Sequence, residues 1–568
     1  MGLVRRFTIG LALTATLGAS TASLAQEMSQ SPAKDLVIAS GPAPATISTP
    51  ATVLQPAAVR PDRDGLADPE VAVSASLTPP VVASPPLRPR VLVKRPLAKL
   101  VLLPPPSAER PVTPRQRLRP FARLRLPALA LLPLPPPVPA PRRTVTLTIA
   151  GDLGMGGHMQ PVRSEGAVRQ GSTIPWREWT DRIRPLIDGD LNFANLETAV
   201  TERNDLRAES KTFNFRSHPE GVRHIVGIGF NLLSTANNHS MDFGAVGAID
   251  TVNHLDRIQA TGRLKAHAGL GRNREEAGRA HVVEVADSKV AFSAVGIVTG
   301  GFPHHRAADN RPGQMAYQSP EDFADVTRRL ADATAAYRIL SVHHGIERQV
   351  QTDATALRKL RHEAVLGRGI DLVIGHHAHV VQGVEIVNGR LIFYGLGNFL
   401  HPGMQNMGSF GLCRDYGLFA RLHLASDDTG HLRIRAVEVI ALTDMHHKVS
   451  RMSTAQSAER VQVLNYLAGG LDDGATGARG LRFAAQSDGS GLYCADGAAN
   501  DPGRIGKLCQ NWRGPDVLNA AQRSRVASSC GYINQPPLET VRTPRPDSVA
   551  VRRDRRAEVE KVNSFSGN

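Results

Sequence analysis

The stretch DLVIGHHAHVVQGVEIVNGRLIFYGLGNF, residues 371–399, decides how the rest of the chain is interpreted. Its apolar start, residues 372–374, predicts a buried strand that breaks at Gly375 into a turn. The turn carries three imidazoles, those of His376, His377 and His379. Neutral imidazole is a good ligand for zinc, iron or manganese, and open α/β sheets collect their sites at the carboxyl ends of strands. One such His would be interpreted as part of a solvated turn, whereas the cluster predicts a metal or phosphate site.

Two strands predicted earlier in the chain also end in carboxylates. The run TVTLTIAGD, residues 144–152, alternates and then becomes apolar, as a strand does, and it ends at Asp152. A second predicted strand, residues 190–194, leads through an Asn and a Leu to Glu197. One carboxylate at the end of a strand is weak evidence for a metal site, and two gain weight only together with the other strand ends.

A third predicted strand, from residue 229, leads into amide, imidazole and carboxylate groups. They are Asn237, Asn238, His239 and Asp242. A helix is expected from about Gly244, because Ile249, Val252 and Leu255 are spaced as one buried face.

Two more strands are predicted nearer the carboxyl terminus. Residues 338–342 form an apolar run that leads into His343 and His344, with Glu347 shortly after. Residues 391–394, inside the opening stretch, predict a further strand followed by a loop with Asn398. With polar side chains at so many strand ends, the pattern resembles the metallophosphoesterase plan, in which such residues hold two metal ions that activate water.

A closer resemblance rests on six motifs in order: GDLGMGG, NLE, TANNHSMDFG, HHGIE, GHHAHVVQG and YGLGNF. They resemble the CapA-like family of poly-gamma-glutamate capsule synthesis proteins over residues 144–445. The resemblance implies an α/β fold, a metallophosphatase-like four-layer α/β/β/α sandwich. It also implies a secreted, periplasmic or cell-envelope location and a part in capsule or exopolymer synthesis.

The resemblance assigns roles residue by residue. It implies a centre of two divalent ions, manganese, iron or zinc, whose ligands are Asp152, Glu197, Asn238, His343, His377 and His379, with His376 as an alternative. Glu197 would bridge the ions. His239 would protonate the leaving oxygen, with Asp242 orienting it. Residues that would contact substrate or support the ligands are Asn237, His344, Glu347, Gln382 and Asn398.

Three positions depart from the family patterns. Gly154 stands where ordinary metallophosphoesterases have a His two residues after the first Asp, His344 replaces a usual Trp, and Ala378 replaces a usual Pro. The first departure predicts a weaker or differently built metal site. His304 and His305 lie outside the motifs and are expected at the surface.

Outside residues 144–445 the composition changes. Residues 1–25 have a basic start, an apolar run and a small-residue cleavage site at Ala25, which predicts a secretory signal peptide. Residues 26–143 are rich in Pro, Ala and Arg and predict a disordered tether. Residues 88–143 hold thirteen Lys or Arg and one acid, most of the chain's formal net charge of +15.

A secreted tether that carries this charge disfavours a nucleic-acid partner. Anionic cell-envelope or capsular polymers, or membrane headgroups, fit better, as does a membrane-bound polymer synthase complex. The alternative is that the arginines only keep the tether soluble and extended.

Residues 446–538 predict an extension with a helix over 454–468, and residues 539–568 a charged, disordered tail. The four cysteines, Cys413, Cys494, Cys509 and Cys530, predict two disulfides in an oxidising compartment, with three possible pairings.

Two functions fit the sequence. The first is a metal-dependent hydrolase or transferase that acts on a phosphoester or on a cell-envelope polymer. The second is a non-catalytic component of polymer export or anchoring, which binds anionic chains through the metal site. The number of candidate ligands favours the first, and Gly154 leaves room for the second.

Overall fold

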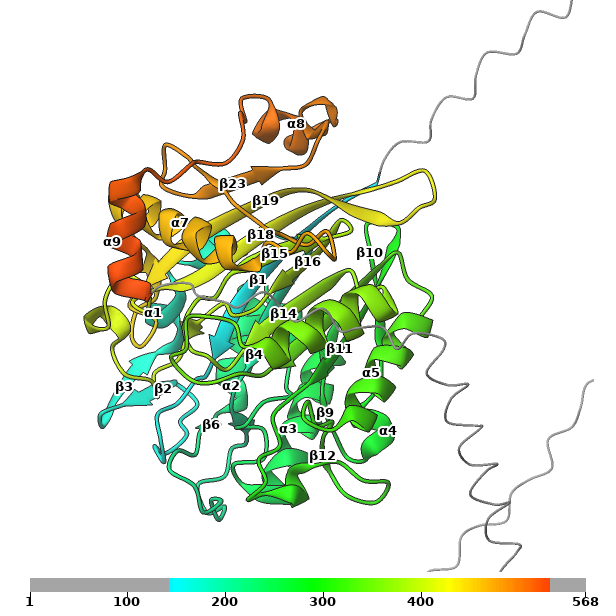
Figure 1. The fold of residues 1–568 in the computed structure, drawn as a ribbon. Helices are drawn as coiled ribbons and strands as arrows, with labels where there is room; N and C mark the ends of the chain where they lie inside the picture. The colour runs from blue at the N-terminus through cyan, green and yellow to red at the C-terminus, as the bar shows by residue number, and fades with distance from the viewer. Residues whose placement is uncertain (1–142, 532–568) are drawn as a thin grey trace, which may run out of the picture. The chain divides into compact units, whose positions relative to one another are not determined.

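Two large β-sheets form the centre of the structure, a computed structural model that describes residues 143–531 (Figure 1). The predicted signal peptide, tether and charged tail lie outside the described residues and stay predictions. The first predicted strand forms, because β1 spans Thr144–Leu153.

The first sheet is 10-stranded and joins the first and last parts of the described chain. Its parallel half consists of β1, β4 (Leu191–Leu196), β7 (Leu232–Ser234) and β8 (Ala266–Ala268), with β17 (Asn398–Leu400) also parallel to β1. Its antiparallel half consists of β18 (Gly417–Ser426), β19 (Leu432–Thr443), β20 (Ser450–Arg451), β23 (Gly491–Cys494) and β22 (Ala484–Ala485).

The second sheet is 7-stranded. Its parallel strands are β11 (Ser288–Val295), β13 (Tyr337–His343), β14 (Leu372–His376) and β16 (Arg390–Phe393). Antiparallel strands flank them: β10 (His281–Val285), β15 (Val384–Val387) and β21 (Arg479–Gly480). Short ribbons complete the strands: β2 (Gly166–Arg169) with β3 (Ser172–Pro175), β5 (Ala199–Val200) with β6 (Arg216–Ser217), and β9 (Leu270–Gly271) with β12 (Gly313–Gln314).

Helices connect the strands and cover the sheets. The α-helices are α1 (Trp176–Thr180), α2 (Pro219–Gly227), α3 (Gly244–Gln259), α4 (Arg274–Ala277), α5 (Pro320–Asp332), α6 (Ala354–Ala356), α7 (Thr454–Ala468), α8 (Arg504–Cys509) and α9 (Ala520–Cys530). Helix η3 (Leu357–Leu366) is a π-helix. Single 3₁₀ turns are η1 (Arg184–Leu186), η2 (Pro303–His305), η4 (Met407–Ser409), η5 (Gly469–Leu471) and η6 (Ala498–Asn500).

The two sheets pack face to face. Phe193 of β4 meets Phe292 of β11 edge-on, with ring centroids 5.8 Å apart, so aromatic side chains cross the interface between the sheets. Because successive side chains of a strand point to opposite faces, Ile339 of β13 joins this central core while Leu340 joins a second apolar cluster with Phe323 of α5. The second sheet is therefore covered by the other sheet on one face and by helices on the other.

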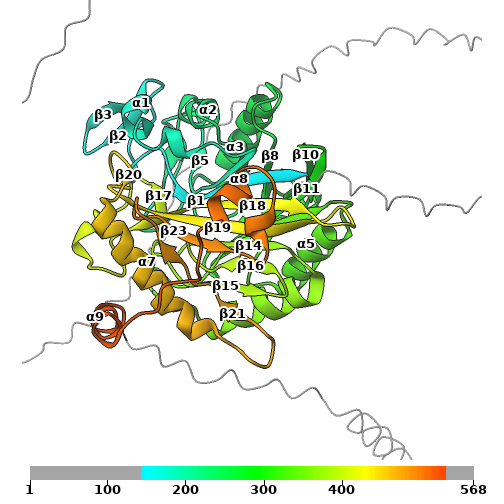
Figure 2. The ribbon, with the colours of Figure 1, turned by 90° about the horizontal axis from the view of Figure 1, so that it is seen from above.

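The first sheet is covered in the same way, because Val222 and Ile225 of α2 and Leu255 of α3 belong to its core. Figure 2 shows α2 and α3 on one side of the sheets, with α7 on the other. These layers confirm a mixed α/β fold. No helix within residues 143–531 combines the length and apolar composition needed to cross a membrane.

The segment after residue 445 is built into both sheets. Its strands β20, β22 and β23 extend the first sheet, and β21 extends the second. Disulfides join Cys413 to Cys530 and Cys494 to Cys509, which selects one of the three possible pairings. The first of these ties α9 to the loop before β18, so this segment and the preceding domain share one core.

Candidate metal centre

The parallel strands of both sheets bring their carboxyl ends to one place. In the first sheet Asp152 of β1 pairs with Asn195 of β4. In the second, His343 of β13 pairs with His376 of β14. The Nδ1 atom of His376 lies 3.0 Å from Asp152 Oδ1, so a contact between these buried side chains joins the two sheets.

A glycine permits the close backbone approach at this point. A Cβ atom at Gly151 would stand 1.9 Å from the carbonyl oxygen of Gly397, which only a residue without a side chain avoids. Asp152 N donates a hydrogen bond to that same oxygen at 3.0 Å. The approach aligns Asp152 with Asn398 of β17, whose Oδ1 lies 2.9 Å from His379 Nδ1.

The Asp152 carboxylate is held by three neighbours. Asn195 Nδ2 donates to its Oδ1 at 2.9 Å, where His376 also lies, and His379 Nδ1 is 3.2 Å from its Oδ2. Burial alone would raise the pKa of Asp152, but the hydrogen bonds and charges of His376 and His379 outweigh it and hold the pKa well below its usual value. Asp152 is therefore ionised at neutral pH.

Glu197 follows β4 and is fully buried, yet neither of its oxygens accepts a hydrogen bond from any residue between 143 and 531. Its Oε1 lies 3.3 Å from His343 Nε2 and 3.8 Å from His379 Nε2. Burial, and then repulsion by Asp152, raise its pKa well above the usual value. A buried carboxylate without hydrogen bonds destabilises the folded state unless it is protonated or coordinates a cation. These unpaired oxygens therefore fit a metal ion.

The imidazoles surround this carboxylate. His343 Nε2 lies 2.7 Å from Asn238 Oδ1 and 3.1 Å from His377 Nδ1. One ligand atom each from Glu197, His377 and His379 lie within 4.8 Å of one another. His377 and His379 both have positive φ, 90° and 54°, a conformation that side chains other than glycine rarely adopt and that is found mostly where function requires it.

The pKa values of these imidazoles respond to the two carboxylates. Burial, with the neighbouring imidazoles, lowers the pKa of His343 well below its usual value and that of His377 to about 3, which leaves both neutral and able to bind a metal. Burial would also lower the pKa of His379, but Glu197 and Asp152 raise it to about 10. The carboxylates of Asp152 and Glu197 thus favour a proton on His379. A bound metal ion would supply the positive charge in place of that proton.

Beside the ligands lies a second polar group. His239 Nδ1 is 2.8 Å from Asp242 Oδ2, and Lys211 Nζ is 2.5 Å from Asp242 Oδ1. The backbone N–H of Phe215 also donates to the fully buried Asp242. These contacts fix the orientation of the His239 imidazole, and Lys211 Nζ also donates to the carbonyl oxygen of Asn238.

Comparison with known proteins gives a match over the part of the chain that carries this site. Residues 146–402 match the family described as bacterial capsule synthesis protein PGA_cap. These residues are therefore similar to this capsule synthesis family. The resemblance to the CapA-like family is confirmed.

Similar proteins come from several bacteria. The PGA biosynthesis protein CapA of Bacillus subtilis is 24% identical over 303 residues, which cover 52% of this chain and 72% of that protein. The capsule biosynthesis protein CapA of Bacillus anthracis is 24% identical over 261 residues, 45% of this chain and 59% of that protein. A probable polyglutamine synthesis accessory protein of Mycobacterium tuberculosis is 30% identical over 238 residues, 40% of this chain and 60% of that protein.

Among solved structures, one similar chain is GAP50, the anchor in the inner membrane complex of Plasmodium. It has 11% sequence identity and a TM-score of 0.27, and the match covers 54% of this chain and 89% of that chain.

The structure gathers most of the predicted site residues in one place. The residues joined by the contacts above are Asp152, Glu197, Asn238, His239, Asp242, His343, His376, His377, His379 and Asn398. Asn237 supports them, because its Nδ2 donates to Leu196 O at 2.9 Å and its Oδ1 accepts from His239 N at 3.1 Å.

Three predicted residues lie apart from these contacts. His344 is buried and its ring meets Tyr317 at 5.5 Å, on the side of the second apolar cluster. Gln382 Nε2 donates to Gln349 O at 2.7 Å. Glu347 is exposed, and within residues 143–531 no hydrogen bond or ion pair joins it to an imidazole. Its charge still acts on Glu197 and His379, so its influence is electrostatic.

Three residues of the site escaped the sequence analysis. Asn195 holds Asp152, Lys211 holds Asp242, and His401 lies 3.9 Å from Glu197 Oε2. Asn195 lies one residue before the end of β4 and His401 directly follows β17, the same signal that pointed to the other candidate ligands. Lys211 comes from a loop between β5 and β6, where no strand-end pattern points to it.

Another cluster lies outside the motifs. Glu209 Oε1 is 3.0 Å from His304 Nε2 and 3.5 Å from His305 Nε2. The surface expectation holds for His304, but it is wrong for His305, which is buried because its ring stacks on Phe302. Glu209 N also donates to Asp242 O, so the cluster supports the loop that carries Lys211.

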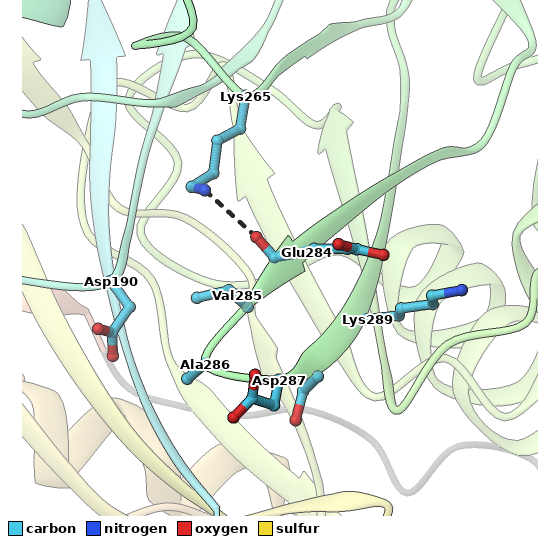
Figure 3. Close-up of a pocket in the computed structure, with 8 residues that line it drawn as sticks. Asp190, Lys265, Glu284, Val285, Ala286, Asp287 and Lys289 are labelled. Atoms are coloured by element: carbon cyan, nitrogen blue, oxygen red, sulfur yellow. Dashed lines mark hydrogen bonds between the residues drawn. The ribbon is translucent and has the colours of Figure 1, made fainter.

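A hollow of about 560 Å³ lies at the other end of the strands (Figure 3). It is lined by Asp190, which precedes β4, by Lys265, which precedes β8, and by residues 284–289 around the turn between β10 and β11. Lys265 Nζ donates to Glu284 O at 3.2 Å there. Because none of its lining residues is a candidate ligand, this hollow is separate from the metal centre.

Proposed function

We propose that this protein acts in extracytoplasmic capsule or exopolymer synthesis, on a poly-gamma-glutamate-like polymer, as a metal-dependent hydrolase or transferase. Its substrate would be a phosphoester or a bond in a cell-envelope polymer. The observation that carries the proposal is the pair of unpaired oxygens of Glu197, buried among imidazoles, Asp152 and an amide oxygen. The names of the bacterial relatives point to the same process.

The residues that would hold the ions are Asp152, Glu197, Asn238, His343, His377 and His379, with His376 against Asp152. Bound divalent ions supply Lewis-acid polarisation and activation of water for attack. The mixture of carboxylate, imidazole and amide oxygen suits manganese, iron or zinc.

His239 would donate a proton to the leaving group. Its Nδ1–H donates to Asp242, which leaves Nε2 as the atom that exchanges a proton with the substrate. Burial lowers the pKa of His239, although Asp242 opposes the effect, so the imidazole is mainly neutral when free. An anionic substrate beside it would favour the protonated form, which makes His239 an acid only in the complex.

The layers of helices and sheets support a metallophosphatase-like four-layer α/β/β/α sandwich, with the site where parallel strands of both sheets end. We place the protein outside the cytoplasm on the strength of residues 1–25, and we assign the basic residues 88–143 to attraction of anionic polymer or membrane headgroups near a polymer synthase complex.

The test is metal analysis and turnover with the chain that lacks only residues 1–25. Strands after residue 445 complete both sheets, so a shorter piece is not used. The protein would be supplied with manganese, iron or zinc, its bound metal measured, and chromogenic phosphodiesters, phosphomonoesters and poly-gamma-glutamate assayed. Asp152→Asn and His379→Ala should lose metal and turnover, whereas Asp190→Asn, at the opposite end of β4, should keep both.

A wild-type protein without stoichiometric metal would refute the metal-dependent function. Metal binding without turnover of any of these substrates would replace it with the non-catalytic role, in which the centre binds anionic chains for export or anchoring.

A further inference from the structure

His401 is a buried histidine whose position in the fold is not explained by packing alone. It follows β17 directly and is fully buried. Its backbone N–H donates to Met445 O at 2.8 Å, but no other residue of the described part of the chain is a hydrogen-bond partner of either ring nitrogen. A buried histidine that only fills space normally satisfies at least one ring nitrogen, so these two atoms require another explanation.

The ring of His401 faces the second oxygen of Glu197. Its Nε2 lies 3.9 Å from Glu197 Oε2, whereas His343 and His379 lie nearest to Oε1. The two oxygens therefore meet different imidazoles. The titratable neighbours that act most strongly on the His401 ring are His379, His239 and Asp152, so the ring lies among the residues of the centre.

A missing side chain makes room for this imidazole. A Cβ atom at Gly154 would stand 3.1 Å from His401 Nε2, and Gly154 N donates to Leu400 O at 2.8 Å. Gly154 lies two residues after Asp152, at the end of β1. The His401 ring thus occupies the space that a side chain at position 154 would enter.

We propose that His401 is a metal ligand of this centre, on the Oε2 side of Glu197, and that it supplies from β17 the imidazole that position 154 lacks. The inference rests on the proposed function, because it assumes that the centre holds divalent ions. Asn238, His343 and His377 lie on the Oε1 side, so Glu197 would separate two ligand groups. An additional imidazole favours zinc or iron over the harder magnesium and calcium ions.

The experiment measures metal stoichiometry and affinity in the chain without residues 1–25. Wild type, His401→Ala and the control His254→Ala are each loaded with zinc, and separately with cobalt for its visible absorption. His254 is a buried histidine of α3 outside the centre. We expect two ions per chain in wild type and in His254→Ala, and one ion, or a second bound about 10–100-fold more weakly, in His401→Ala.

A rescue variant sharpens the test. Gly154→His combined with His401→Ala places an imidazole in the same space from the other strand, and it should restore the second ion and the cobalt spectrum. His401→Phe keeps the ring volume beside Phe215, whose centroid lies 4.9 Å from that of His401. This variant must also lose the ion, and it replaces His401→Ala if the alanine variant does not fold.

The outcomes separate the two claims. If wild type binds metal and both His401 variants bind the same amount with unchanged affinity and spectrum, the inference about His401 is wrong and the proposed function stands. If wild type itself binds no metal, the proposed function fails, and the inference with it.

Discussion

The candidate metal centre and the cluster around Arg361 both bury several charged side chains, but the hydrogen bonding of these side chains differs. Arg361 of η3 donates to both oxygens of Glu385 on β15, and to Asp473 at 3.0 Å and Leu471 O at 3.0 Å. Tyr394 OH also donates to Glu385 at 3.0 Å. At the metal centre, Glu197 accepts no hydrogen bond from the described residues.

The difference separates a structural role from a functional one. A buried ion pair with every oxygen satisfied stabilises one packing of the chain and leaves nothing to bind. Glu197 and Asp152 repel each other and leave oxygens open, an arrangement that folding alone would not favour. Burial of charge is therefore a poor marker of a site, and unpaired buried atoms are a better one.

Replacing Glu197 should have the largest effect on binding. Glu197→Gln keeps the shape but removes the charge between the two ligand groups, so we expect loss of bound metal and of any turnover. Without metal, the variant should melt at the same or a higher temperature than wild type, because a repulsive buried carboxylate has gone. Metal analysis and thermal unfolding with a chelator check both; a clear fall in melting temperature would show that Glu197 supports the fold.

Arg361→Ala should give the opposite result. It leaves Glu385 buried without its partner, so unfolding free energy should fall by about 3–5 kcal/mol while the folded protein still binds metal. Urea unfolding measures the change. Arg358→Ala, on the exposed side of the same helix, is the control and should stay within about 0.5 kcal/mol of wild type.

A second partnered carboxylate tests the comparison by pH. Glu438 of β19 lies 2.6 Å from Arg421 Nη1; burial would raise its pKa, but His423 and Arg421 lower it from 4.5 to about 2. Because the folded pKa lies below the unfolded one, its stabilisation is present above pH 4.5 and lost as pH falls toward 2.

The loss should amount to roughly 2–3 kcal/mol. Urea unfolding of wild type and Glu438→Gln at pH 6 and pH 3 measures it. The variant should lose less stability between these pH values than wild type, and an equal loss in both would assign the acid sensitivity to other groups.

The smallest expected effect concerns a residue that positions a ligand. Asn398→Ala removes the oxygen 2.9 Å from His379 Nδ1, so metal affinity should fall about 10–100-fold without loss of the site. Competition with a chelator measures the affinity. Asn406→Ala, in the exposed loop that follows, should leave it unchanged, and an unchanged affinity in Asn398→Ala would mean that Asp152 alone orients His379.

Sequence periodicity located the elements that carry the ligands. The predicted strands that end near Asp152, Glu197, His343 and His376 all form, and the helices predicted from Gly244 and over residues 454–468 match α3 and α7. These runs are apolar and short, and polar residues end them abruptly, so local pattern and final structure agree.

Other elements escaped prediction because their partners are distant. The hairpin of β18 and β19 forms the middle of the first sheet, yet its buried Arg421 and His423 interrupt the apolar pattern and are acceptable only because Glu438 lies opposite. Strands β21, β22 and β23 are too short to show a pattern in the sequence, and pairing with neighbouring strands stabilises them.

The sequence by itself determined that carboxylates, amides and imidazoles follow successive strands, since that information lies in the order of neighbouring residues. Only the tertiary structure decided which of them meet. Packing of the two sheets brings Asp152 into contact with His376 and leaves the oxygens of Glu197 unpaired. It also places the His401 ring in the space beside Gly154. His344 and Gln382 make other contacts. Such meetings depend on distances between strands far apart in the chain, which no local pattern encodes.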